Sequence, residues 1–296
     1  MSQTWDEIGF RTGAHRLQGY RSGAGNPHKL LLAHGGPGVP CSYLFHAHRH
    51  YADHGFDVVS WDQLGCGKSD RPEDKSLWSV ARYVQELDDV RAHLGWERFL
   101  LLGNSWGGIL TMEYALAHGH RLRAAVIGNI AASIPPVARG FERCKAALGE
   151  ATVRMMAQRE AEGSTEHPEY AAARTLLLYR HMCRLDVWPQ ALLDSLGPEA
   201  IGRGPWDTMF GPHFFNCSGN LRNWDRLDDM PKLSMPCLLT ASEWDYVLPE
   251  FVRMTAEHIP GAKLAFFRNS AHLPFWDAPE AYHAAVLPFL QAHAEA

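Results

Sequence analysis

The sequence predicts an α/β fold, in which a mostly parallel, doubly wound sheet carries helices on both faces. With 296 residues, the chain is long enough for one large domain or for a domain with an inserted subdomain. Short apolar runs alternate with helical patterns, and runs that are apolar on both faces are typical of strands buried between two helical layers. The runs are KLLLAH (29–34), FDVVSW (56–61), RFLLLG (98–103), AAVIGN (124–129), PCLLTAS (236–242) and KLAFFR (263–268).

Other patterns place the elements around these strands. Residues 7–20 alternate around Thr12-Gly13 and predict an N-terminal hairpin. Apolar residues recur at three- and four-residue spacing over 79–94 and are followed by Gly95, which predicts a helix with a glycine cap. The pattern over 278–294 predicts a closing helix.

The interval 133–230 breaks the alternation of strands and helices. It opens with Pro135-Pro136, contains helical patterns over 137–162 and 168–184, and holds no convincing buried strand. We therefore expect an α/β core formed by residues 1–132 and 231–296, with a mostly helical cap inserted at 133–230.

Composition limits the partners. The formal net charge is −5 and no basic stripe is present, which argues against binding to nucleic acid. The start MSQTWDEIGF has no basic region followed by an apolar one, and no later run approaches the roughly 18 apolar residues of a membrane span. We expect a cytoplasmic protein that does not contact membranes. The six cysteines form no C-x-x-C pair, and nothing in the sequence predicts the oligomeric state.

One serine lies in a glycine-rich turn, in LLGNSWGGIL (101–110). Ser105 occupies the centre of a G-x-S-x-G motif between a predicted strand and a predicted helix, the context of a nucleophile elbow. Such a turn leaves the backbone N–H of Trp106 at a helix N-terminus, where it can donate to an oxyanion. The motif also occurs by chance, so a tight turn with an incidental serine is the alternative.

A nucleophilic serine needs a general base and a group that orients the base. After the cap, two predicted strands are followed by Asp245 and by His272. The chain order of serine, acid and histidine, each after a strand, makes Asp245 the expected acid and His272 the expected base. Glu243 is a second candidate acid, and a helix cap is the alternative role for Asp245.

The loop after the first buried run contains a second set of glycines, in HGGPG (34–38). Positions without side chains let backbone N–H groups approach a bound carbonyl oxygen. We expect Gly36 to be the second donor to the oxyanion, together with Trp106.

These residues together resemble the proline iminopeptidase family of α/β hydrolases, especially its tricorn-interacting aminopeptidase members. The matching motifs are HGGPG (34–38), DQLGCGKSD (62–70), GNSWGG (103–108), SEWD (242–245), SAHLPFWD (270–277) and, in the cap, HPEY (167–170), GP (211–212) and NWDRLDDM (223–230). The resemblance implies an α/β-hydrolase fold with a helical cap. It also implies a serine hydrolase that cleaves a small amide or peptide bond through an acyl-enzyme on Ser105, with Asp245 and His272 completing the triad and no cofactor.

The chain departs from that family at two positions. In the aminopeptidase members, carboxylates shortly after the GP pair and directly after the catalytic aspartate hold the free amine of the substrate. Phe214 and Tyr246 stand there in this chain. A hydrogen bond to a charged group is worth about 1.5–3 kcal/mol, so we expect weak binding of free amines unless Glu243 or Asp207 compensates.

Aromatic residues at these positions favour an apolar substrate pocket, for which the candidate residues are Phe214, Tyr246, Trp206 and Phe275, with Glu243 as a polar member. The alternative is that the aromatic side chains only pack the core of the cap. The substrate is then a small-molecule amide or peptide, or in the nearest alternative an ester or lactone. A non-catalytic ligand-binding protein is a further alternative, because fold does not imply function.

Two other patterns in the sequence suggest a different kind of site, a metal site and a phosphate-binding loop. His46, His50 and His54 would share one helix face at a spacing of four residues, but no carboxylate or cysteine completes a set, so we expect no metal site. The stretch DQLGCGKS (62–69) is similar to a phosphate-binding loop but lacks its first glycine at the required spacing. We expect this stretch to brace the rim of the active site.

Overall fold

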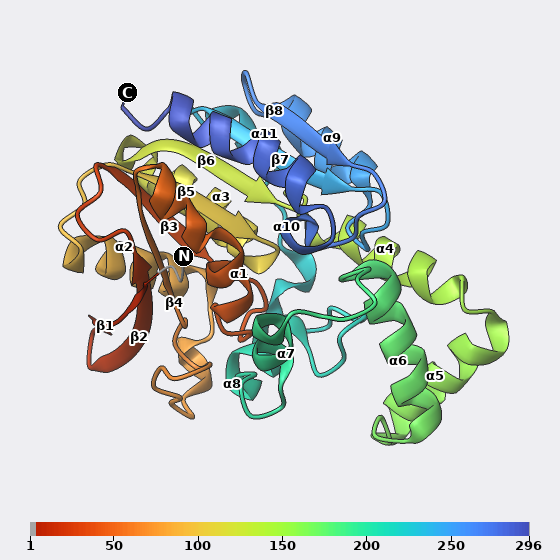
Figure 1. Cartoon of the computed structure of the whole chain (residues 1–296). Helices are drawn as coiled ribbons and strands as arrows, with labels where there is room; N and C mark the ends of the chain where they lie inside the picture. The colour runs from red at the N-terminus through yellow and green to blue at the C-terminus, as the bar shows by residue number, and fades with distance from the viewer. Residues whose placement is uncertain (1–3, 296) are drawn as a thin grey trace.

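The centre of the computed structural model, which describes residues 4–295, is one sheet of eight strands (Figure 1). The strand order is β1-β2-β4-β3-β5-β6-β7-β8, and every neighbouring pair from β4 to β8 is parallel. The strands are β1 (Asp6–Thr12), β2 (His15–Ser22), β3 (His28–Ala33), β4 (Phe56–Trp61), β5 (Phe99–Asn104), β6 (Leu122–Gly128), β7 (Cys237–Ser242) and β8 (Lys263–Phe267). The predicted fold class and the predicted N-terminal hairpin, β1 and β2, are confirmed.

Helices cover both faces of the sheet and create two hydrophobic clusters. Along β3, Leu31 joins one cluster while Leu30 and Leu32 join the other, because successive side chains of a strand point to opposite faces. The first cluster includes residues of α2 (Val80–His93), α3 (Trp106–His118) and α9 (Pro249–His258). The second includes residues of α1 (Ser42–His48), α10 (Pro274–Asp277) and α11 (Pro279–Ala292). The parallel strands therefore present their carboxyl ends at one edge of a sheet that is buried on both sides.

The last strand differs from the expectation. The run KLAFFR was expected to be buried on both faces, but β8 is an edge strand with β7 as its single neighbour. Within it, Phe267 is buried, Leu264 and Ala265 are only partly buried, and Phe266 is 43% exposed. An edge strand lacks the covering that a central strand receives, so the apolar pattern alone overstated its burial.

The segment between β6 and β7 is mostly helical and lies to one side of the sheet, in green and cyan in Figure 1. It contains α4 (Ile134–Ala146), α5 (Glu150–Glu162), α6 (Pro168–His181), α7 (Gln190–Leu196), α8 (Arg203–Pro205), the π-helical turn η4 (Trp206–Phe210), and the 3-10 turns η5 (Asn220–Asn223) and η6 (Leu227–Lys232). The helical pattern over 137–162 corresponds to two helices, α4 and α5, which are separated at Gly149, where φ is 91°. We propose that 133–230 is the cap.

None of the helices in the described part of the chain combines the length and the apolar character that crossing a bilayer requires.

A buried glutamate on α2 couples the stability of the core to pH. Glu86 accepts hydrogen bonds from Trp61 Nε1 (2.8 Å) and from the backbone N–H of Leu64 (3.1 Å), and Arg82 lies 3.4 Å away. Burial nevertheless raises the pKa of Glu86 from 4.5 to about 7. The folded chain therefore holds a proton that the unfolded chain has already lost between these two pH values.

The free energy of unfolding is expected to fall, on account of Glu86, by on the order of 3 kcal/mol as pH rises from about 4.5 to about 7. The contribution is absent below 4.5, where both states are protonated. Urea unfolding of the wild type and of Glu86→Gln at pH 5 and at pH 8 measures it. The stability of the wild type relative to Glu86→Gln should be lower at pH 8, and a pH-independent difference would contradict the prediction.

Candidate active site

Ser105 lies at the sharp turn between β5 and α3, with φ of 59° and ψ of −122°. This conformation is strained for a residue with a side chain, as expected of a nucleophile elbow. The flanking glycines are required by close packing of α3 on the sheet. A Cβ atom on Gly103 would overlap the carbonyl oxygen of Gly107, and one on Gly107 would overlap the carbonyl oxygen of Ala33. The G-x-S-x-G spacing therefore permits this turn.

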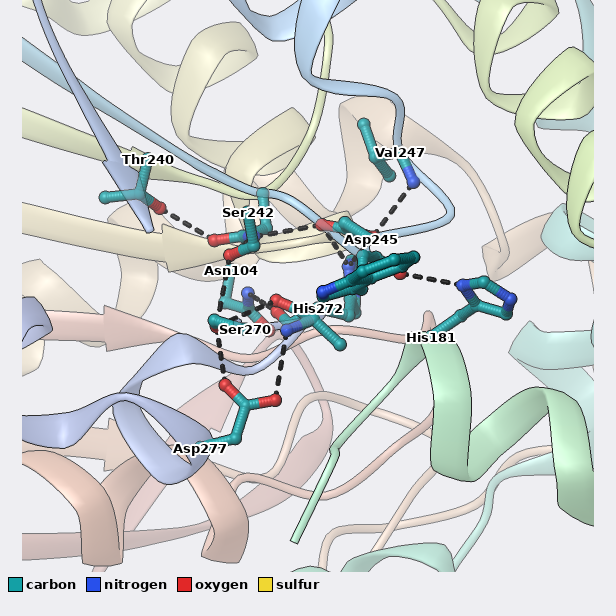
Figure 2. Close-up of polar contacts among 12 residues, drawn as sticks. Asn104, His181, Thr240, Ser242, Asp245, Val247, Ser270, His272 and Asp277 are labelled. Carbon is teal, nitrogen blue, oxygen red and sulfur yellow. Dashed lines mark hydrogen bonds and ion pairs between the residues drawn. The ribbon is translucent and has the colours of Figure 1, made fainter. Parts of the chain in front are cut away.

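The loops after β7 and β8 bring Asp245 and His272 together, as Figure 2 shows. His272 Nδ1 lies 2.9 Å from Asp245 Oδ1 and 3.1 Å from Oδ2, and both side chains are buried. Asn104 Nδ2, next to Ser105, donates to the carbonyl oxygen of His272 at 3.4 Å and so ties this loop to the end of β5. Within the described residues, the buried Nε2 of His272 has no hydrogen-bond partner. The imidazole is thus oriented through one nitrogen, and the other remains available.

Further hydrogen bonds fix the carboxylate of Asp245. The backbone N–H of Val247 donates to Oδ1 (2.9 Å), and Asn129 Nδ2 donates to Oδ2 (2.9 Å). Asn129 follows β6 with a φ of 52°, and its own oxygen accepts a hydrogen bond from Thr240. Asn129 was not predicted from the sequence as a site residue. The feature that could have identified it is an asparagine at the end of a predicted strand, because this residue type tolerates left-handed backbone and carries an amide donor.

The two backbone N–H groups expected to bind an oxyanion lie at adjacent strand ends. Gly36 follows β3 with a φ of 121°, and Trp106 begins α3. In the described part of the chain, no hydrogen bond uses either N–H. Two of the three glycines of the HGGPG loop, Gly35 and Gly36, line the same cavity as Ser105.

Gln63 connects the loops that carry these two N–H groups. Its backbone N–H donates to His34 Nε2 (2.9 Å), and its side-chain oxygen accepts from the indole of Trp106 (2.8 Å). Burial lowers the pKa of His34 to about 4, so the imidazole is neutral at pH 7 and can accept this bond. The DQLGCGKSD stretch therefore contacts the HGGPG loop, in agreement with its expected bracing role, although Gln63 itself was not singled out from the sequence.

Ser105 and His272 line a cavity between the sheet edge and the segment 133–230. The cavity, its open mouth included, encloses about 690 Å³ that no protein atom fills. Trp206, Phe214 and Tyr246 line it as expected. Among the described residues, no Asp, Glu, Lys or Arg side chain lines it. The wall is therefore apolar apart from a few hydroxyl, amide and imidazole groups.

Tyr246 covers His272, with the ring centroids 4.2 Å apart and the planes inclined by 32°. Burial raises the pKa of Tyr246 well above its ordinary value, and a hydrogen bond from Ser105 opposes this shift. The phenol is therefore neutral at physiological pH. Phe141 and Phe214 contact the other parts of the Tyr246 ring, at centroid distances of 5.0 and 6.1 Å.

Two expected pocket residues lie elsewhere. Glu243 is exposed, and its carboxylate accepts a hydrogen bond from the backbone N–H of Asn269 (2.9 Å). Phe275 is buried in the second hydrophobic cluster, 5.1 Å from the ring of His48, and does not line the cavity. The expectation that these two residues contribute to the pocket is corrected accordingly.

The expected histidine face also takes a different form. His46 lies in α1, but the chain passes at Arg49 into a 3-10 turn, η1 (Arg49–His54), so the three histidines do not share one α-helical face. In the described residues, no group of three or more His, Cys, Asp or Glu side chains is placed to hold a metal ion.

Comparison with known proteins places the chain in a family. A sequence model of the alpha/beta hydrolase fold family matches residues 29–145. The proline iminopeptidase of Heyndrickxia coagulans is 31% identical over 272 residues, which cover 92% of each chain. The chain belongs to the proline iminopeptidase family of α/β hydrolases. The proline iminopeptidase of Flavobacterium johnsoniae is 30% identical over 266 residues, 88% of this chain and 89% of that enzyme.

A solved structure supports the same assignment. The crystal structure of the proline iminopeptidase of Mycobacterium smegmatis superposes with a TM-score of 0.89 at 29% identity, covering 98% of this chain and 99% of that one. Membership of the proline iminopeptidase family makes the chain a peptidase-like hydrolase. The resemblance inferred from the motifs is confirmed.

Proposed function

We propose that the protein hydrolyses a small amide or peptide bond by transferring the acyl group to Ser105 and then to water. The buried pair of His272 and Asp245 carries this proposal, because His272 lines the same cavity as the strained serine and its Nε2 has no hydrogen-bond partner among the described residues. His272 takes the proton of the Ser105 hydroxyl as Oγ attacks the substrate carbonyl, and later gives it to the leaving amine. Asp245 accepts a hydrogen bond from Nδ1–H and stabilises the imidazolium.

The oxyanion of the tetrahedral intermediate is bound by the backbone N–H groups of Gly36 and Trp106. Both belong to loops that Gln63 joins, so the two donors are held in place before the substrate arrives. Donors fixed in advance stabilise developing charge more strongly than mobile water does. A water molecule activated by His272 then releases the acyl group from Ser105.

An ester or lactone is the second candidate substrate, and the uncharged cavity favours it. The same residues would act in the same roles, with an alcohol instead of an amine leaving after protonation by His272. A small-molecule amide, peptide or ester is therefore the expected partner of the site.

A fluorophosphonate probe tests the proposed function on the wild-type protein. The probe is expected to form one covalent adduct, which peptide mapping by mass spectrometry places on Ser105, because only an activated serine attacks phosphorus at a useful rate. An N-acyl anilide and an ester that share one acyl group then separate the two candidate substrates by kcat/KM. A folded wild type that neither forms the adduct nor hydrolyses these substrates would instead indicate a non-catalytic ligand-binding protein.

A further inference from the structure

The side chains that line the cavity indicate which chemical groups the substrate has on each side of the bond that is cleaved. Resting on the proposed function, we propose that the substrate is uncharged and apolar on both sides of the scissile carbonyl, so that a free ammonium group next to this carbonyl is discriminated against. The acyl half is then an alkanoyl or N-blocked aminoacyl group, and the leaving half an apolar amine or alcohol.

Many of the apolar lining residues fall into two groups that belong to different hydrophobic clusters, while Phe210 and Phe214 pack against both clusters. One group, here called the β6 lobe, comes from the chain after β6, from α4 and from η5, and consists of Ile130, Ile134, Val137, Phe141 and Leu221. The other group, here called the β3 lobe, comes from the chain after β3, from the end of α6 and from α7, and consists of Val39, Tyr43, Met182, Leu192 and Leu196. Neither lobe contains a charged side chain.

Ser105 lies between the two lobes because of the strand order. It follows β5, which pairs with β3 on one side and with β6 on the other. A carbonyl group that points its oxygen at Gly36 and Trp106 has its two substituents directed apart. One substituent therefore enters the β6 lobe and the other enters the β3 lobe.

The nearby polar groups already have partners within the protein. The hydroxyl of Tyr43 accepts from the N–H of Gly35 (2.8 Å) and donates to Asn104 (3.1 Å). The carboxylate of Asp245 receives hydrogen bonds from His272, Val247 and Asn129. An ammonium group in either lobe would lose its water without gaining a carboxylate.

The acids that could have compensated point elsewhere. Glu243 is exposed and bonded to Asn269, and Asp207 forms an ion pair with Arg203 (2.6 Å) at the surface. Glu113 accepts hydrogen bonds from Trp224 and Arg226. None of these carboxylates lines the cavity, so the desolvation of a buried ammonium group stays uncompensated.

Two substrates that differ only in the amine test this inference. Leucine p-nitroanilide and 4-methylpentanoyl p-nitroanilide have the same carbon skeleton, the same leaving group and the same scissile bond. The amine-free substrate is expected to have a kcat/KM higher by on the order of 10- to 100-fold at pH 6, where the leucyl amine is protonated. A higher or equal kcat/KM for the leucyl substrate would overturn the inference.

The same pair has an internal control in pH. An α-amino group loses its proton near pH 8, so the preference is expected to shrink as pH rises from 6 to 9. Ionisation of groups on the free enzyme affects both substrates alike and cancels in the ratio. A preference that stays constant with pH would show that the charge is not its cause.

The leaving half is tested with 4-methylpentanoyl benzylamide and 4-methylpentanoyl allylamide, whose leaving amines have similar basicity. We expect the benzylamide to be favoured in kcat/KM by on the order of 10-fold or more, because its ring fills an apolar lobe. Equal values would contradict the assignment of an apolar lobe to the leaving half.

A matched pair of variants at Phe214 tests whether the lack of a carboxylate in the cavity causes the discrimination against a free amine. Phe214 is partly exposed and lines the cavity, so a carboxylate there can remain hydrated without substrate. For each variant, kcat/KM for the leucyl substrate is divided by kcat/KM for the amine-free substrate. This ratio is expected to be higher by on the order of 10-fold in Phe214→Glu than in Phe214→Gln. The same ratio in both folded variants would contradict the role given to charge.

Fluorophosphonate labelling of the same preparations distinguishes a failure of the proposed function from a failure of the inference about the substrate. An unlabelled, inactive and folded wild type contradicts the proposed function itself. Complete labelling of Ser105 together with a preference for the leucyl substrate contradicts only the inference about the substrate.

Discussion

Replacing Ser105 with alanine is expected to lower kcat by on the order of 10⁴- to 10⁶-fold, whichever amide or ester proves to be the best substrate. The change removes the only atom that forms the acyl-enzyme in the proposed mechanism, while the donors at Gly36 and Trp106 remain. The alanine keeps the Cβ atom that already sits in the strained turn, so the fold is expected to persist. Initial rates at saturating substrate, with far-UV circular dichroism on the same samples, measure the effect.

Ser164 provides the control for this substitution. It lies in the segment 133–230, where its hydroxyl bonds to Glu162 (3.3 Å), and it does not line the cavity. Ser164→Ala should keep the rate and the fluorophosphonate adduct of the wild type. A folded Ser105→Ala protein that retains more than about a hundredth of the wild-type rate would contradict the role of Ser105 as nucleophile.

The sequence is most informative where a candidate catalytic residue directly follows a predicted strand. A buried strand that stops at G-x-S-x-G, and two later strands that stop before Asp245 and His272, predict side chains at one sheet edge because parallel strands share the direction of their carboxyl ends. The structure brings Asp245 within 2.9 Å of His272 on this principle. This prediction needs only the order of the strands along the chain and the residues at which they end, both of which apolar periodicity reveals.

The partners of these residues could not be predicted in the same way. Asn129 reaches Asp245 across 116 residues of chain, and Gln63 reaches Trp106 across 43. Which buried amide meets which acceptor depends on how neighbouring loops pack, and no periodic pattern in the sequence records it. The same reason explains the wrong placement of Phe275, since a residue close to His272 in sequence can still point into the core.

The break between α4 and α5 shows a related limit. A single glycine within a helical pattern is tolerated at a cost of about 1 kcal/mol, so Gly149 did not exclude one long helix. Its left-handed backbone in the structure ends α4 and redirects the chain into α5. Phe141 of α4 thereby lines the β6 lobe, while α5 packs against α6.

Replacing Asp245 with asparagine is expected to lower kcat by on the order of 10⁴-fold with little change of shape, and the surrounding donors explain why. The N–H of Val247 requires an acceptor at Oδ1, which leaves the new amide NH₂ at the place of Oδ2. There it faces Asn129 Nδ2, whose own amide is held by the hydrogen bond from Thr240. Oδ1, 2.9 Å from His272 Nδ1, carries no negative charge in this variant and no longer stabilises an imidazolium. The new NH₂, at the place of Oδ2 and 3.1 Å from Nδ1, favours the tautomer that carries its proton on Nε2.

A histidine in that tautomer cannot accept the proton of Ser105, so the loss should appear in kcat and in the rate of fluorophosphonate labelling alike. Asp88→Asn is the matched control, because Asp88, like Asp245, accepts several hydrogen bonds, here from Arg91 and Tyr114, but lies on α2, away from the cavity. That variant should keep the wild-type kcat. If Asp245→Asn labelled as fast as the wild type, the orientation of His272 would have to come from another contact, and Asp245 would be a structural residue that satisfies Asn129 and Val247.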